Sequence, residues 1–279
     1  MIVNILVCTI DAGIERVEKI LLDPRSDLKY IISHQVTDER FKKIPESLKR
    51  SDILVGQIEG RGLSRNRNNA FSMADGDIAI LADDDVHYRE EYINNVIKTF
   101  EAEPDLGVAC LKIATPEGDP EFKDYTDHPY LLNEESSHYI STLEISYRIK
   151  LIRSRGIVFD ERFGLGSELN SFGEEAVFIH DCIRAGIKVK YIPEYVVEHP
   201  AVTTIKSLDK YATLNVVFKG AYDARRYGWL AFPAAFLDYF RLRGDLKAEA
   251  KKPKDYLRER LRGACYIFFK QDKDRASKT

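Results

Sequence analysis

Short apolar runs alternate with segments of helical periodicity along residues 1–100. Four runs are apolar enough to be buried strands of a sheet: residues 2–9, 28–33, 52–55 and 78–82. A helix is predicted after the first strand, from apolar side chains at helical spacing: Ile14, Val17, Ile20 and Leu21. Another helix is predicted over residues 88–100. Strands that alternate with helices in this way are typical of a parallel, doubly wound α/β sheet.

Further elements are predicted downstream. Residues 107–113 and 189–192 have the composition of strands, and we expect Pro193 to end the second of them. Residues 174–184 have the pattern of a helix. Residues 140–152 fit either a strand at the edge of the sheet or a helix.

The pattern changes again near residue 206. From there to residue 269 strand signals vanish, and Tyr, Phe, Arg and Lys recur at helical spacing. We therefore expect an α/β domain of residues 1–206 and a helical C-terminal extension of residues 207–279. Its aromatic and basic side chains either make a peripheral membrane contact or pack on the main domain or a partner. They are Tyr222, Arg225, Arg226, Tyr227, Trp229, Phe232, Phe236, Tyr239, Phe240, Arg241 and Arg243.

Composition excludes several classes of protein. The 279 residues are 44% hydrophobic and 31% charged, so a core can form. The net charge of −3 argues against a nucleic-acid partner bound through bulk positive charge. The four cysteines form no Cys-x-x-Cys pair, so neither a zinc knuckle nor a disulfide framework is expected. The sequence has no bilayer-spanning apolar run and no signal peptide, which favours a cytoplasmic protein, with or without membrane association.

The fourth predicted strand ends in three consecutive carboxylates, Asp83, Asp84 and Asp85. Side chains alternate along a strand, so Asp83 and Asp85 are expected on one side and Asp84 on the other. Three negative charges this close favour a bound cation, and oxygen ligands suit Mg²⁺ or Mn²⁺. Ligands of open α/β sheets bind at this end of the strands. The alternative is that Asp85 only caps the next helix.

Two motifs resemble a known family. Gly62-Leu-Ser-Arg-Asn-Arg-Asn, followed by Ala74-Asp-Gly-Asp and a strand ending in Asp-Asp-Asp, is similar to the inverting, nucleotide-sugar-dependent glycosyltransferases of family 2. Phe172-Gly-Glu-Glu resembles the segment that supplies the catalytic base in that family. The resemblance covers residues 1–205. It implies the GT-A fold, a Rossmann-like and mostly parallel sheet flanked by helices.

The resemblance also implies a metal ion, Mn²⁺ or Mg²⁺, on the diphosphate of the sugar donor. Asp85 would bind this ion, and Asp83 would contact the ion or the ribose. Asp84 would point away or lie near the donor sugar. His199, just past a predicted strand, would complete the metal shell, or else has a structural role.

The family places an Arg-Asn pair in the nucleotide pocket, and Arg67 and Asn68 match it. Their alternative role is to start the helix and to pair with the aspartates. Gly166 lies in a Gly-rich loop that would pass close to the donor sugar, or else is only a turn.

The nucleotide base is the point at which the sequence departs from the family. An Asp usually ends the second strand and reads the base, but here Ser33 is followed by His34 and Gln35. We expect His34 or Gln35 to hydrogen-bond a uracil edge, with help from Thr9. Asp11 is the nearest carboxylate.

Glu175 aligns with the catalytic base of the family, which is usually Asp. A carboxylate in reach of an acceptor hydroxyl can take its proton in the transition state. Glu174 is the alternative base. Both residues would also stabilise the N-terminus of the following helix through its dipole.

The sequence therefore predicts an inverting, metal-dependent glycosyltransferase. It would move a hexose from a UDP-sugar to a glycan or lipid-linked acceptor, in bacterial surface polysaccharide synthesis. One alternative is a sugar-phosphate nucleotidyltransferase, for which residues 11–16 are a poor phosphate loop. The other is an inactive homologue that acts as a scaffold.

Overall fold

The computed structural model describes residues 1–134, 140–169, 172–201 and 211–269. Its contacts divide the chain into two compact units, Met1–Phe159 with Phe178–Val202 and Asp160–Val177 with Thr203–Thr279. The domain boundary expected at residue 206 falls outside the described residues and stays a prediction.

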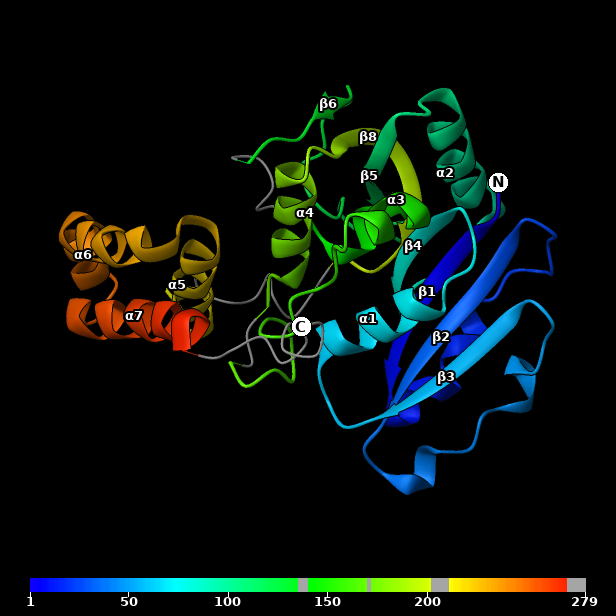
Figure 1. Ribbon diagram of the computed structural model, residues 1–279, viewed down its shortest axis with the longest axis horizontal. Helices are drawn as coiled ribbons and strands as arrows, with labels where there is room; N and C mark the ends of the chain where they lie inside the picture. The colour runs from blue at the N-terminus through cyan, green and yellow to red at the C-terminus, as the bar shows by residue number, and fades with distance from the viewer. Residues whose placement is uncertain (135–139, 170–171, 202–210, 270–279) are drawn as a thin grey trace. The chain divides into compact units, whose positions relative to one another are not determined.

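Within the described residues of the first unit, eight strands form one sheet in the order β3-β2-β1-β4-β7-β5-β8-β6 (Figure 1). They are β1 (Val3–Ile10), β2 (Leu28–Val36), β3 (Ile53–Glu59), β4 (Ile78–Asp83), β5 (Leu106–Ala114), β6 (Tyr130–Leu131), β7 (Ile145–Arg148) and β8 (Lys188–Glu198). β1 to β4 pair in parallel, as do β5 and β8, while β7 and β6 run antiparallel to their neighbours. The predicted α/β sheet, parallel for the most part, is confirmed.

Helices cover both faces of this sheet. They are α1 (Leu63–Met73), α2 (Glu90–Ala102), α3 (Ile149–Ser154) and α4 (Glu174–Arg184). Alternate residues of β1 face opposite cores: Ile5 belongs to the cluster that includes side chains of α2, and Leu6 to the one that includes side chains of α1, α3 and α4. Burial of both faces explains why the parallel strands are continuous apolar runs.

The segment after β1 corrects one prediction. Instead of an α-helix, the chain forms two short 3₁₀ helices, η1 (Asp11–Glu15) and η2 (Val17–Ile20). Their buried apolar side chains are Ile14, Val17 and Ile20. A constant spacing of three residues matches the three residues per turn of a 3₁₀ helix better than the 3.6 of an α-helix.

Three strand predictions also change. β3 continues to Glu59, beyond the predicted end at residue 55. Within residues 140–152 the short helix η6 (Thr142–Glu144) leads into β7 and then α3, and β7 lies inside the sheet between β4 and β5. β8 continues through Pro193, because its register to β5 shifts there: Cys110 pairs with Tyr191, whereas Lys112 pairs with Tyr195. A bulge tolerates a residue that has no amide hydrogen.

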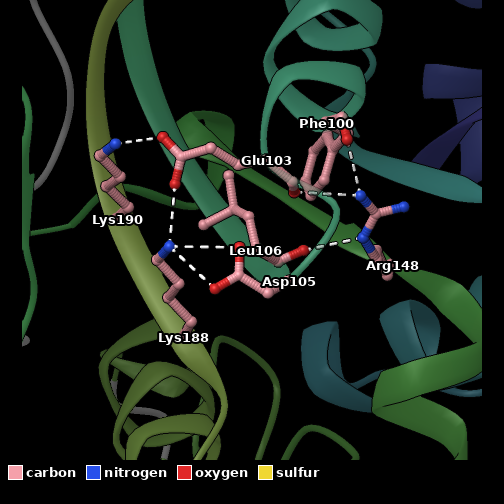
Figure 2. Close-up of polar contacts among 7 residues, drawn as sticks. All are labelled: Phe100, Glu103, Asp105, Leu106, Arg148, Lys188 and Lys190. Atoms are coloured by element: carbon pink, nitrogen blue, oxygen red, sulfur yellow. Dashed lines mark hydrogen bonds and ion pairs between the residues drawn. The ribbon is translucent and has the colours of Figure 1, made fainter.

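Arg148, the last residue of β7, joins the C-terminal end of α2 to the sheet through hydrogen bonds (Figure 2). Its guanidinium donates to three carbonyl oxygens, those of Phe100 at 2.7 Å, Glu103 at 3.2 Å and Leu106 at 2.8 Å. The last carbonyls of a helix have no partner within the helix, so a cation at this point satisfies them. Lys188 reinforces the same turn through its 3.0 Å contact with Glu103.

The second unit is helical, as predicted for the extension. It contains α5 (Thr213–Tyr227), the short helix η7 (Gly228–Leu230), α6 (Ala231–Ala248) and α7 (Pro253–Phe269). Arg260 of α7 is 1% exposed and donates to Asp223 of α5 at 2.8 Å and to Asp238 of α6 at 2.9 Å. Of the helices in the described part of the chain, none has the length and apolar character needed to cross a lipid bilayer.

Candidate active site

The carboxyl ends of β1, β2 and β4 meet at one edge of the sheet. The parallel register places Thr9 beside His34, and Cys8 beside both Ser33 and Asp83. The polar residues predicted from these strand ends are therefore neighbours along the edge. Burial raises the pKa of Cys8 to about 12, so its thiol is protonated near neutral pH.

Asp84 is buried and held by two segments. It accepts hydrogen bonds from the Thr9 hydroxyl and from Arg16, whose Nη2 lies 2.5 Å and Nε 3.2 Å from Oδ1. A Cβ at Gly13 would overlap the Asp84 carboxylate and the Thr9 hydroxyl, so only glycine allows η1 to pass this close. Arg16 was not predicted as a partner of Asp84. Its place in the first turns after β1 was the available signal.

Asp83 and Asp85 contact other elements. Asp83 Oδ1 lies 3.7 Å from the Arg67 guanidinium, and Asp85 Oδ1 lies 3.7 Å from Nε2 of His199. The helix-cap alternative for Asp85 is wrong. α2 begins at Glu90 with Arg89 as its N-cap residue, and Arg89 makes no side-chain cap bond.

A short antiparallel bridge brings Asp85 and His199 together. The amide of His87 donates to the Glu198 carbonyl at 2.9 Å, and the amide of Glu198 donates back to the His87 carbonyl at 2.9 Å. The bridge fixes the segment just after Asp85 against the end of β8, one residue before His199. Two positions over a hundred residues apart in the sequence are thereby placed side by side.

The tautomer of His199 follows from its contacts. Nδ1 lies 2.8 Å from the Pro200 carbonyl oxygen, which can only accept, so Nδ1 carries a proton. In a neutral imidazole, Nε2 is then an acceptor, and it faces the Asp85 carboxylate, which also only accepts. A cation between the two satisfies both groups, and the Nδ1 hydrogen bond orients the ring in the way that metal-binding histidines require. The donor set of Asp85 and His199 thus fits a divalent metal ion.

Asp83 does not complete a preformed metal shell. Among the residues that the structure describes, no group of three or more His, Cys, Asp or Glu side chains is close enough to hold an ion. The metal set of Asp83, Asp85 and His199 stays a prediction, as does the identity of the ion.

The polar residues of α1 contact the end of β1, the end of β4 and the backbone of Phe159. Arg67 is 3% exposed, and its guanidinium lies 5.6 Å from the Phe159 ring centroid. Asn68 donates to the Phe159 carbonyl at 2.9 Å and accepts from its amide at 2.8 Å. Asn66, which the sequence analysis did not single out, donates to the Thr9 carbonyl at 3.1 Å. Arg67 thus lies near Asp83, as its alternative role proposed, and nucleotide contact stays a prediction.

His34 and Gln35 are engaged within the protein. His34 is fully buried; its Nε2 lies 3.0 Å from the Asp11 carbonyl and its Nδ1 3.2 Å from the Gln57 amide nitrogen. Burial lowers the pKa of His34, which favours the neutral ring. Gln35 donates to the Gly62 carbonyl at 3.1 Å. A contact of either side chain with a uracil stays a prediction, and for His34 it would require exchange of one of its two bonds.

Asp11 has a φ of +46° and shapes the turn after β1. Its carboxylate accepts from the Thr37 amide at 2.7 Å, the Thr37 hydroxyl at 2.5 Å and the Asp38 amide at 3.2 Å. Burial acts to raise the pKa of Asp11, but these hydrogen bonds outweigh it and lower the pKa. Asp11, the carboxylate nearest to the predicted base pocket, is therefore ionised, and its oxygens accept the hydrogen bonds that stabilise this turn.

Glu174 and Glu175 open α4, as the sequence predicted, and stand in its first turn. Glu174 is buried and Glu175 half-buried. Gly166 has a φ of +79°, a conformation that glycine adopts without strain. These three residues belong to the second compact unit, whereas the aspartates belong to the first. Their roles as base and donor contact stay predictions.

Comparison with known proteins gives one family and a set of similar folds. The family model described as Glycosyl transferase family 2 matches residues 16–168, more than half of the chain. A curated relative is the glucosyl-dolichyl phosphate glucuronosyltransferase of Haloferax volcanii, 27% identical over 112 residues. That match covers 38% of this chain and 36% of the relative, so the chain matches only about a third of the relative's length.

Two solved structures of S. aureus TarS (residues 1–349) are similar in fold. One has a TM-score of 0.56 at 16% identity, over 72% of this chain and 60% of that chain. The other, a complex with UDP-GlcNAc, has a TM-score of 0.56 at 15% identity, over 100% of this chain and 76% of that chain. At such identities the similarity shows the fold.

Proposed function

This chain belongs to glycosyl transferase family 2 and has the GT-A fold, and from this premise we propose that it transfers a hexose from a UDP-sugar. The observation that carries the proposal is the pairing of Asp85 with His199 at the carboxyl end of β4, inside a chain that matches the family. The complex of S. aureus TarS with UDP-GlcNAc supports a UDP-sugar as donor. Membership of the family sets the nucleotidyltransferase alternative aside.

The proposed acceptor is a hydroxyl of a glycan or of a lipid-linked sugar. The name of the Haloferax volcanii relative, which includes a glucosyl-dolichyl phosphate, supports the lipid-linked form. We place the reaction in bacterial surface polysaccharide synthesis, with inversion at the transferred carbon. Glu175, with Glu174 as the alternative, would take the proton of the acceptor hydroxyl as the new bond forms.

Asp85 and His199 would hold a divalent ion, Mn²⁺ or Mg²⁺, with Asp83 as a further ligand. When bound, such an ion neutralises charge on a diphosphate leaving group. Arg67 lies 3.7 Å from Asp83, where its positive charge would offset part of the negative charge of the neighbouring carboxylates. Asp84 would position η1 through Thr9 and Arg16 and leave the two flanking carboxylates for ligands.

The test measures binding first and turnover second. We expect Mn²⁺ and UDP together to raise the melting temperature, since both bind only the folded state. The Asp85→Asn variant should bind Mn²⁺ at least about tenfold more weakly in calorimetry, because a carboxylate ligand is lost. Asp119→Asn, the same change at an exposed residue, is the matched control.

Turnover then separates a transferase from an inactive homologue. Wild-type protein should release UDP from at least one UDP-sugar, and Glu175→Gln should reduce this release by about 10²-fold or more. A wild type that binds UDP with Mn²⁺ but never turns over would support the scaffold alternative. A wild type that binds no UDP-sugar at all would refute the proposed donor.

A further inference from the structure

The exposed side of α6 carries an apolar stripe where a surface helix normally carries polar residues. Phe236, Leu237 and Phe240 are 46%, 70% and 63% exposed. Spacings of three and four residues place them on one side of the helix. Trp229 and Leu230, in η7 directly before α6, are 66% and 68% exposed. These five residues are the apolar stripe.

The opposite side of α6 supplies the contacts that hold it in the second unit. Ala231, Ala235 and Leu246 are the buried residues of the helix. At 3.6 residues per turn, Leu246 and Leu237 project from opposite sides of the helix. α6 therefore has two apolar sides, and its packing within the described residues uses the one that the stripe does not occupy. Trp229 stacks on Phe268 of α7, with the ring centroids 4.1 Å apart, yet it stays 66% exposed, so packing within the described residues leaves much of the stripe uncovered.

Cationic side chains border the stripe. By helical spacing, Arg243 falls on one border and Arg241 on the other, and Lys247 lies in line with the stripe about two turns after Phe240. Three further lysines, Lys251, Lys252 and Lys254, follow at the turn into α7 and are exposed. Residues 211–269 contain twelve Lys or Arg and six Asp or Glu, a net charge of +6 in a chain of net charge −3. The described C-terminal helices that carry the stripe thus have a net positive charge, whereas the whole chain has a net negative one.

We propose that the apolar stripe docks on a lipid bilayer with anionic headgroups. Large apolar side chains at the acyl boundary, bordered by Lys and Arg at the headgroup phosphates, match the two zones of such a surface. A second copy of this chain fits less well, because two surfaces of like positive charge would repel each other. The inference does not depend on the proposed sugar transfer.

Vesicle binding by the full chain tests the proposal. We expect the protein to co-sediment with phosphatidylcholine vesicles that contain about 30% phosphatidylglycerol and to stay largely in solution with phosphatidylcholine alone. Binding should weaken as salt is added, because screening reduces the attraction between the border cations and the lipid phosphates. Absence of binding to the anionic vesicles would overturn the proposal.

Two double variants separate the apolar and the cationic contributions. Leu237→Ser with Phe240→Ser should lower the partition coefficient by about tenfold or more, since two exposed apolar side chains are lost. Arg243→Glu with Lys247→Glu should lower it by a similar factor of about ten at low salt and much less at high salt. Leu54→Ser, at a residue of β3 that is 49% exposed, is the matched control and should bind as the wild type does.

Two results would refute the proposal that a bilayer covers the apolar stripe. One is wild-type binding by the Leu237→Ser, Phe240→Ser variant. The other is a wild-type dimer in light scattering that this variant converts to a monomer, which would make the stripe an interface between copies. Circular dichroism checks that each variant keeps the helical content of the wild type.

Discussion

At the scale of single residues, the site is shaped by polar groups that bond to the backbone. His34 gives the clearest case, since one ring nitrogen meets the Asp11 carbonyl and the other meets Gln57. The ring is completely buried, and burial lowers its pKa. The neutral ring is a donor at Nε2 and an acceptor at Nδ1, which matches both partners. A proton added to Nδ1 would break the Gln57 contact.

The stability of the first unit should therefore depend on the protonation of His34. Between the lowered pKa of the folded state and a pH of about 6.5, the unfolded chain binds a proton at this residue and the folded chain does not. Neutral His34 therefore contributes fully to the free energy of unfolding above that pH. This contribution falls as the pH drops toward the lower pKa of the folded state. The expected slope is at most about 1.4 kcal/mol per pH unit.

Urea unfolding of the wild type and of His34→Gln, between pH 5 and pH 8, measures this slope. The variant should be less stable but should lose the contribution of His34 to the pH dependence. His128→Gln, at a histidine whose side chain is 72% exposed, should leave the wild-type slope unchanged. Equal slopes in wild type and His34→Gln would contradict the prediction.

The residues of the site were predictable to different degrees. The position of the three aspartates at a strand end followed from the apolar run before them, because burial on both faces leaves a visible pattern. The closeness of Asp85 and His199 came from the family resemblance alone, since it depends on the bridge between His87 and Glu198. The burial of His34 could not be foreseen, because a polar residue at a strand end normally suggests exposure.

At the scale of elements, local spacing and distant pairing decide different features. The apolar spacing of Ile14, Val17 and Ile20 predicted a helix after β1, but the α-helical form was wrong, because the chain forms 3₁₀ turns there. The place of β7 was not readable. This four-residue strand pairs with residues 78–80 and 108–110, which are far away in sequence, and nothing local specifies its neighbours.

The junction of α2 with the sheet shows how an element depends on a distant side chain. The variant Arg148→Met tests this dependence, because methionine keeps much of the apolar stem of arginine and lacks the guanidinium. We expect a loss of about 2 to 3 kcal/mol in the free energy of unfolding, because the three carbonyl oxygens of Phe100, Glu103 and Leu106 lose a charged donor (Figure 2).

Chemical denaturation measures this loss. Arg155→Met removes a guanidinium at an exposed residue and should change stability by less than about 0.5 kcal/mol. If both variants are equally stable, the contacts of Arg148 do not hold the end of α2.

At the scale of the whole molecule, the chain consists of two compact units that the sequence only partly anticipated. The change in pattern after residue 206 correctly indicated the helices of the second unit. The grouping of Asp160–Val177 with those helices was not visible, because most of this range, residues 160–173, is rich in Gly and aromatic residues without periodicity. The match to glycosyl transferase family 2 ends at residue 168, within that segment. The α-helices of the C-terminal unit therefore lie outside the matched residues.

Arg260 connects the three helices of that unit and provides a test of its independence. The guanidinium is almost fully buried between Asp223 of α5 and Asp238 of α6. Its removal takes the buried partner from two carboxylates that keep Lys219, which lies 3.6 Å from Asp223 and 3.5 Å from Asp238. The loss of one partner from such a buried group costs about 3 kcal/mol, the lower end of the usual range. Arg260→Met should therefore destabilise the helical unit, whereas Arg262→Met, at a 55% exposed side chain, should change little.

Hydrogen exchange followed by mass spectrometry reports each unit separately. In Arg260→Met, amides of α5, α6 and α7 should exchange faster by about 10²-fold or more, since opening of the helices becomes less costly. Amides of β1, β2 and β4 should keep their wild-type rates if the first unit is stable by itself. Faster exchange in both units would mean that they unfold together, and the two-unit description would then fail for folding.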